Sequence, residues 1–126
     1  MTRSINKSIA DIEQALKELI PAPKDGEWKN CVIASGETAS NAVDVGKDYD
    51  LMEIQIPTIT SADLTITTAE VLGGTYQTLG GSSNICVAGT GAFDDVFVLG
   101  GWRFIKVVSS AAQGAVRTFR VRGVQP

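Results

Sequence analysis

The chain has 126 residues and a mass of 13.3 kDa, a size that suits a single domain with one core, and its formal net charge is −3. Hydrophobic residues make up 44% of it and charged residues 20%, a composition too apolar for a disordered protein. The sequence has no histidine, which removes the usual general base and the usual zinc ligand. We therefore expect a protein that is not an enzyme.

Charge is distributed unevenly along the chain. Residues 31–100 carry one basic side chain against nine acids, whereas residues 101–126 carry five basic side chains and no acid. Either acidic and basic strands pair in one sheet, or the charges form a contact surface for a partner. The pI near 4.8 argues against a uniformly basic surface, so we expect neither nucleic acid nor an anionic membrane as a ligand.

No apolar stretch approaches the roughly 18 residues of a membrane span, and the N-terminal segment contains acids, unlike a signal peptide. A reducing cytoplasm is the expected site of synthesis. Cys31 and Cys86 lie within apolar runs and cannot form a standard zinc site without histidine. Buried free thiols are the favoured interpretation; a disulfide and, last, a catalytic cysteine are the alternatives.

The first 22 residues predict an amphipathic helix with an apolar stripe in heptad spacing. The stripe consists of Ile5, Ile9, Ile12, Leu16 and Leu19. Pro21 and Pro23 end the helix, and residues 23–30 are expected to form a linker. The stripe either packs on its own domain or forms an oligomer or docking surface, and isoleucine at both core positions of the heptad favours a trimer.

Residues 31–126 alternate short apolar segments with glycine-containing turns and predict an antiparallel β-sandwich of jelly-roll type. The expected strands are 29–35, 41–45, 50–57, 62–69, 75–79, 84–88, 94–99, 102–108 and 115–122. In one of them, Met52, Ile54 and Ile56 share a face opposite Glu53 and Gln55. The fold class is thus all-β with a short N-terminal helix.

Candidate chemical sites are weak. Asp44, Asp48 and Asp50 could offer oxygen ligands to calcium, but their spacing is not that of an EF-hand, and a solvated turn is the expected structure. Residues 89–91 precede an expected strand instead of a helix, so they predict a turn and no phosphate cradle. We expect no catalytic residue, no metal and no cofactor.

The aromatic side chains leave two interpretations open. Trp102 is expected in the core, and Trp28 is expected to pack the helix on the sheet. An exposed sugar platform would instead use Tyr49 and Tyr76. The arginines near the C-terminus are candidate contacts with an acidic partner. They are Arg117, Arg120 and Arg122.

A series of turns and strands is formed by residues 34–46, 52–57 and 62–66, by Gly-Thr-Tyr in 74–79, and by Gly-Trp-Arg-Phe-Ile-Lys in 101–109. This series resembles that of small β-sandwich virion proteins of tailed bacteriophages. The resemblance implies a structural protein of the virion, most specifically a capsid decoration or cement protein that binds the assembled head. The implied partner is the major capsid protein or another virion protein. Alternatives are a carbohydrate- or receptor-binding module of a head or tail fibre, and a neck or tail component.

Overall fold

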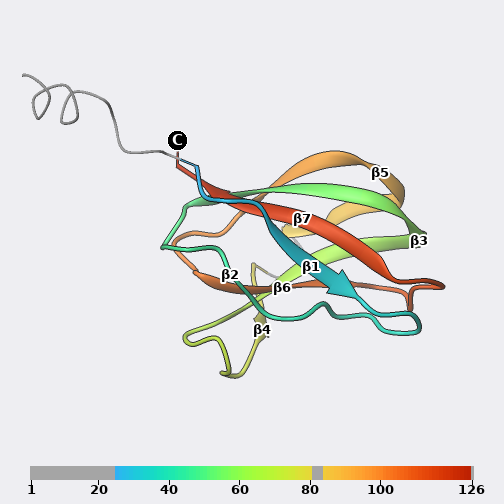
Figure 1. Ribbon diagram of the computed structural model, residues 1–126, viewed down its shortest axis with the longest axis horizontal. Coiled ribbons are helices and arrows are strands. Elements are labelled where there is room, and N and C mark those ends of the chain that lie inside the picture. The colour runs from blue at the N-terminus through green and yellow to red at the C-terminus, as the bar shows by residue number, and fades with distance from the viewer. Residues whose placement is uncertain (1–24, 81–83, 126) are drawn as a thin grey trace, which may run out of the picture.

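The computed structural model describes residues 25–80 and 84–125, which form antiparallel strands and almost no helix (Figure 1). The strands are β1 (Lys29–Ile33), β2 (Val43–Asp44), β3 (Leu51–Ala69), β4 (Gln77–Thr78), β5 (Cys86–Val98), β6 (Phe104–Ser109) and β7 (Arg117–Val124). The expected all-β, antiparallel architecture is confirmed. The helix expected within residues 1–22 lies outside the described residues.

Two long strands, β3 and β5, pair with each other and contribute to both halves of the sheet. The first part of β3 also pairs with β7, and its last part pairs with β6. The register of β3 against β5 shifts between Thr58 and Asp63, where both strands bend and the sheet folds over itself (Figure 1). The prediction of separate strands at 50–57 and 62–69, and at 84–88 and 94–99, is therefore wrong.

Glycines make this bend possible. Gly89 and Gly91 have φ angles of +56° and +77°, in the left-handed region that glycine adopts readily. A Cβ at Gly91 would lie 2.1 Å from the carbonyl oxygen of Pro57, so the two strands approach too closely there for any side chain. Residues 89–91 are thus the bent middle of β5, and the predicted turn at that place is wrong.

A short segment before β2 closes the sheet on one side. The Ser40 amide donates to the carbonyl of Val107 in β6 (2.9 Å), and Asn41 Oδ1 accepts the Val32 amide of β1 (2.8 Å). The Asn41 amide returns a bond to the Val32 carbonyl at 3.3 Å. Residues 40 and 41 therefore bridge β1 and β6, and the sheet is nearly closed around its core.

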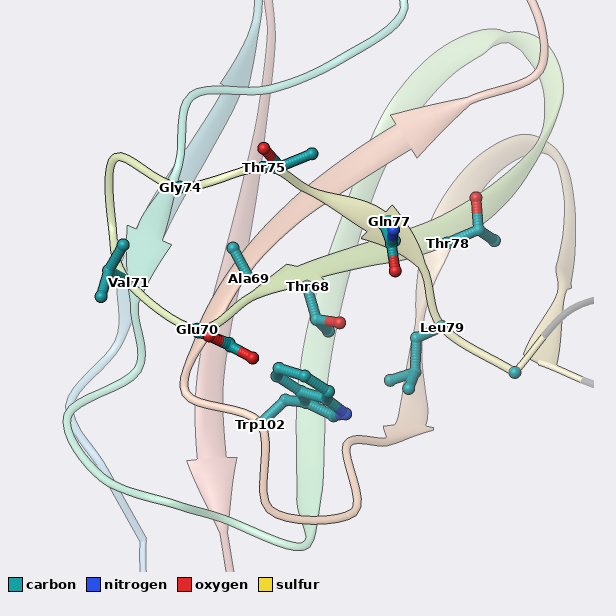
Figure 2. A pocket seen from close by; sticks show the side chains of 11 residues that line it. Thr68, Ala69, Glu70, Val71, Gly74, Thr75, Gln77, Thr78, Leu79 and Trp102 are labelled. Carbon is teal, nitrogen blue, oxygen red and sulfur yellow. The ribbon is translucent and has the colours of Figure 1, made fainter.

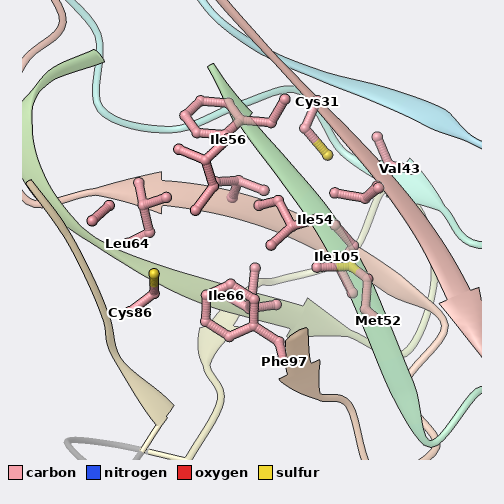
Figure 3. Packing of buried hydrophobic residues seen from close by; sticks show 14 of the residues in the cluster. Cys31, Val43, Met52, Ile54, Ile56, Leu64, Ile66, Cys86, Phe97 and Ile105 are labelled. Atoms are coloured by element: carbon pink, nitrogen blue, oxygen red, sulfur yellow. The ribbon is translucent and has the colours of Figure 1, made fainter. Parts of the chain in front are cut away.

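The core is built by the inward faces of the strands, as period-two alternation predicts (Figure 3). Met52, Ile54 and Ile56 are all buried, which confirms their predicted common face. Cys31 and Cys86 are buried free thiols, as favoured from the sequence. Burial raises the pKa of each thiol to about 12; for Cys86 the nearby Asp95 adds to the effect.

Two aromatic residues differ from expectation. Tyr49 is only 3% exposed, since its ring packs directly on the backbone of Gly123, so it cannot serve as a sugar platform. Trp102 is 38% exposed instead of buried. The physical reason is that β6 begins at Phe104, which leaves Trp102 in the preceding loop and outside the alternation of the strand.

We expect Gly123→Ala to destabilise the protein by about 1–3 kcal/mol, the usual cost of overpacking a core. An added Cβ would lie 1.9 Å from Tyr49 Cδ2. Gly73→Ala is the matched control, since a Cβ there meets nothing within 4 Å, and its effect should stay within about 0.5 kcal/mol. Urea unfolding of both variants measures the difference; equal stabilities would contradict this packing.

We expect both thiols to resist a disulfide reagent such as DTNB in the native protein. With a pKa of about 12, only about one thiol in ten thousand is ionised at pH 8, and Cys31 is in addition inaccessible. Two thiols should react at once in guanidinium chloride. Rapid labelling of the native chain would contradict the buried positions.

Candidate functional site

The outer side of one half of the sheet carries a mixed aromatic, charged and apolar surface, which we call the Trp28 face. It consists of Trp28, Glu53, Gln55, Asp94, Val96, Arg120 and Arg122. The strand register sets Glu53 between Arg122 of β7 and Val96 of β5. The alternation that buries Ile54 in β3 turns its neighbours Glu53 and Gln55 outward.

Two of the three predicted arginines meet at Trp28. The guanidinium of Arg122 lies 4.7 Å from the centroid of the indole ring, and that of Arg120 lies 5.8 Å from it, both within cation–π range. Arg122 also contacts Glu53 Oε2 through Nε and Nη2, each at 3.0 Å, and Asp25 at 3.7 Å. The acidic middle of the chain and its basic end therefore do pair within the sheet.

The arginines differ in what they can still bind. Arg120 is exposed and has no ion pair with another described residue, so its charge is available to an acidic partner. Arg117 lies apart from the other two, since it is on the same face of β7 as the buried Phe119, whereas Arg120 and Arg122 are on the opposite face. Its Nε donates to Gln113 Oε1 at 3.3 Å. The predicted stripe of Ile5, Ile9, Ile12, Leu16 and Leu19 lies outside the described residues.

The second arm of β5 adds exposed apolar side chains to the edge of the Trp28 face. Phe93, Val96 and Val98 are 41%, 51% and 60% exposed. Among the described strands β5 pairs only with β3, so no described strand covers its other edge. On the second arm the Val96 amide donates to Asp95 Oδ1 at 2.8 Å, and the Val98 carbonyl accepts from Asn84 Nδ2 at 3.4 Å. Such an edge can accept a further strand from a partner.

Two hollows lie on the Trp28 face. One of about 210 Å³ is lined by Trp28 and Val96, and one of about 490 Å³ by Phe93 and Arg120. Both are also lined by Gln55 and Asp94, which stand between them. Tryptophan and arginine are enriched in protein–protein hot spots, and phenylalanine is enriched in the cores of interfaces.

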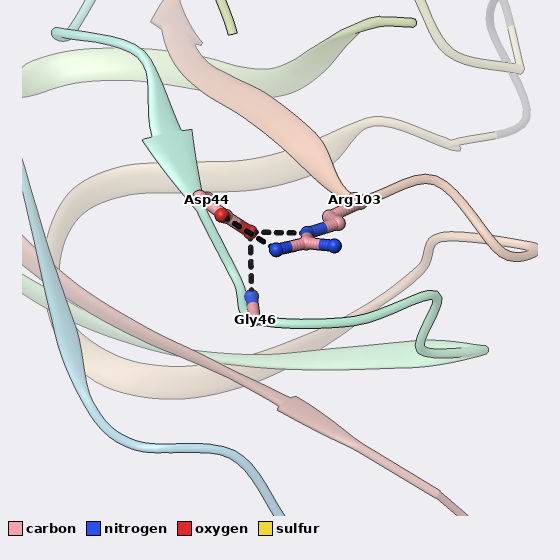
Figure 4. Close-up of polar contacts among 3 residues, drawn as sticks. All are labelled: Asp44, Gly46 and Arg103. Atoms are coloured by element: carbon pink, nitrogen blue, oxygen red, sulfur yellow. Dashed lines mark hydrogen bonds and ion pairs between the residues drawn. The ribbon is translucent and has the colours of Figure 1, made fainter. Parts of the chain in front are cut away.

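Asp44, one of the three aspartates considered as calcium ligands, has a structural role. Both carboxylate oxygens of Asp44 bind Arg103, at 2.7 Å from Nε and 3.0 Å from Nη2, and Oδ1 accepts the Gly46 amide at 2.8 Å (Figure 4). The hydrogen bond from Arg103 is the main cause that lowers the pKa of Asp44. Within residues 25–80 and 84–125 no group of three His, Cys, Asp or Glu side chains could hold a metal ion.

Sequence reasoning missed the exposed edge of β5. Residues 96–99, Val-Phe-Val-Leu, form a continuous apolar run, which is typical of a strand buried on both faces. In the structure only Phe97 and Leu99 are buried. The neighbouring acids Asp94 and Asp95 were the available signal, because charges beside an apolar strand often mark an edge.

Comparison with family models, with curated proteins and with solved structures finds no match for this chain. The part of the chain that the structure describes contains no helix long and apolar enough to cross a bilayer.

We expect Asp44→Asn to lower the melting temperature at pH 7. A carboxyl whose pKa is lowered on folding contributes stability above its unfolded pKa, and this contribution is lost as the pH falls through the folded value. The deficit of the variant should therefore shrink below about pH 4. Asp63→Asn is the control, since Asp63 is exposed and forms no ion pair with a described residue. A deficit that is independent of pH would contradict the ion pair.

Proposed function

We propose that this protein is a structural virion protein of a tailed phage, and most specifically a decoration or cement protein that binds the assembled head. In this proposal the folded-over sheet is a small jelly-roll-like β-sandwich. The observation that carries the proposal is the Trp28 face with the exposed arm of β5 at its edge: a docking surface of hot-spot composition. The resemblance of the strand segments to small virion proteins supports the same assignment.

The chemistry of the face favours a different protein as its partner over a second copy at the same strand. Antiparallel self-pairing of β5 about its acidic pair would bring Asp94 and Asp95 against their own copies, and like charges across paired strands are destabilising. A capsid protein with a basic group opposite Asp94 and an acid opposite Arg120 would satisfy both charges. Oligomerisation, with a trimer favoured, is assigned to the N-terminal stripe.

Such a protein needs no catalysis. A molecule that binds only the assembled lattice, across subunit boundaries, stabilises that lattice by mass action. The lack of histidine in the whole chain and the burial of both thiols agree with a role without nucleophilic or acid–base chemistry. The virion is accordingly the proposed location, reached by assembly in the host cytoplasm.

Co-sedimentation with phage heads that lack this protein tests the proposal. Val96→Asp should weaken binding at least about tenfold, because it places a charge in the apolar edge of the interface. Val87→Asp is the matched control: Val87 is 79% exposed on the same strand, but on the arm before the bend. Arg120→Glu should weaken binding as well.

Light scattering with size exclusion tests the stripe separately. Ile9→Asp combined with Leu16→Asp should convert a trimer to a monomer if the stripe forms the oligomer. Undiminished binding of Val96→Asp to heads, or equal loss in Val87→Asp, would overturn the assignment of the Trp28 face. Failure of the wild-type chain to bind heads would overturn the proposed function.

A further inference from the structure

A second surface, independent of the Trp28 face, lies where β4 and the loop before β6 meet. Figure 2 shows the indole of Trp102 pointing into a hollow of about 420 Å³, with Thr68, Glu70 and Leu79 around it. A neighbouring hollow of about 440 Å³ is lined by Trp102, Leu79 and Asn84. Trp102 thus stands between the two hollows, which we call the Trp102 groove.

The loop that presents Trp102 is held rigidly. The amides of Leu99 and Gly100 both donate to the Asp50 carbonyl, at 2.7 and 3.0 Å, and the Gly101 amide donates to the Tyr49 carbonyl at 3.0 Å. On the far side of Trp102, Arg103 is fixed by its two bonds to Asp44 (Figure 4). An exposed tryptophan on a fixed loop binds a ligand with little loss of conformational entropy.

The polar side chains of the groove have not used their hydrogen-bonding capacity. Glu70, Gln77 and Thr78 are exposed, and their side chains make no hydrogen bond or ion pair with another described residue. A carboxylate supplies acceptors only, whereas an amide and a hydroxyl supply both donors and acceptors. Together they match a ligand that carries several hydroxyl groups around an apolar ring face.

The charge of the groove argues against an anionic ligand. Its described lining contains the carboxylate of Glu70 and no lysine or arginine. A phosphate, sulfate or carboxylate on the ligand would therefore meet repulsion without compensation. Arg103, next to Trp102 in the sequence, is bound to the Asp44 carboxylate. The ammonium of Lys106 lies over the Tyr76 ring, 4.6 Å from the centroid.

We propose that the Trp102 groove binds a neutral carbohydrate, with the apolar face of a pyranose stacked on the indole of Trp102 and its hydroxyls bound to Glu70 and Gln77. The site differs from the aromatic platform of Tyr49 and Tyr76, which the sequence left open as an alternative. Tyr49 is buried, and the Tyr76 hydroxyl is bound to the Leu72 carbonyl at 2.6 Å. Sugar binding at the Trp102 groove does not depend on the proposed binding to phage heads.

Tryptophan fluorescence tests the proposal in the full chain. The sequence has two tryptophans, so Trp28→Phe leaves Trp102 as the sole reporter. Titration with maltose, cellobiose, lactose and diacetylchitobiose should give a saturable change in emission for at least one sugar. Calorimetry with that sugar should show binding weakened at least about tenfold in Trp102→Ala and unchanged in Trp28→Phe.

Charge variants complete the test. Glu70→Gln should weaken binding several-fold through loss of charge-assisted hydrogen bonds, whereas Glu37→Gln, an exposed glutamate outside the groove, should not. The absence of binding by all four sugars would overturn the proposal. So would binding that survives Trp102→Ala, or a preference for sialyllactose over lactose, which would require a cation at the site.

Discussion

The close approach of β3 and β5 at their common bend is the constraint on which the rest of the structure depends. At Gly91 the backbone of β5 lies so near the Pro57 carbonyl that a side chain has no space. Because both strands bend there, each supplies side chains to two parts of the core, with Met52 and Leu64 buried before and after the bend of β3. These two strands thereby supply half of the residues in the buried core.

The same bend divides β5 into two arms with different surroundings. The edge of β5 that faces away from β3 must be protected from pairing with other chains. Native sheets protect such edges with charges. In β5 the position paired with the buried Ile54 is occupied by an acid, Asp95. An acid at that position discourages nonspecific pairing. The flanking Val96 and Val98 keep enough apolar surface for a partner that matches the charges.

The sequence was informative wherever one physical rule acts alone. Alternation along β3 identified the buried Met52, Ile54 and Ile56, and the succession of short apolar segments and turns identified the all-β class. The continuity of β3 was not predictable, because Pro57 normally interrupts a strand and the bend that tolerates it depends on glycines more than 30 residues away. The prediction that Trp102 is buried was wrong for a similar reason. Its exposure depends on where β6 begins, which a tertiary ion pair between Asp44 and Arg103 helps to set.

The pairing of β1 with β7 joins residues 29–33 to residues 117–121, nearly the full described length of the chain apart. A contact between such distant segments has a high loop-closure entropy, so its formation is expected to be a slow step in folding. During synthesis β1 has no partner strand on that edge until β7 has left the ribosome. The half of the sheet that carries Trp28 is then completed last, after the β3–β5 ribbon, whose partners are closer in sequence, has had time to form.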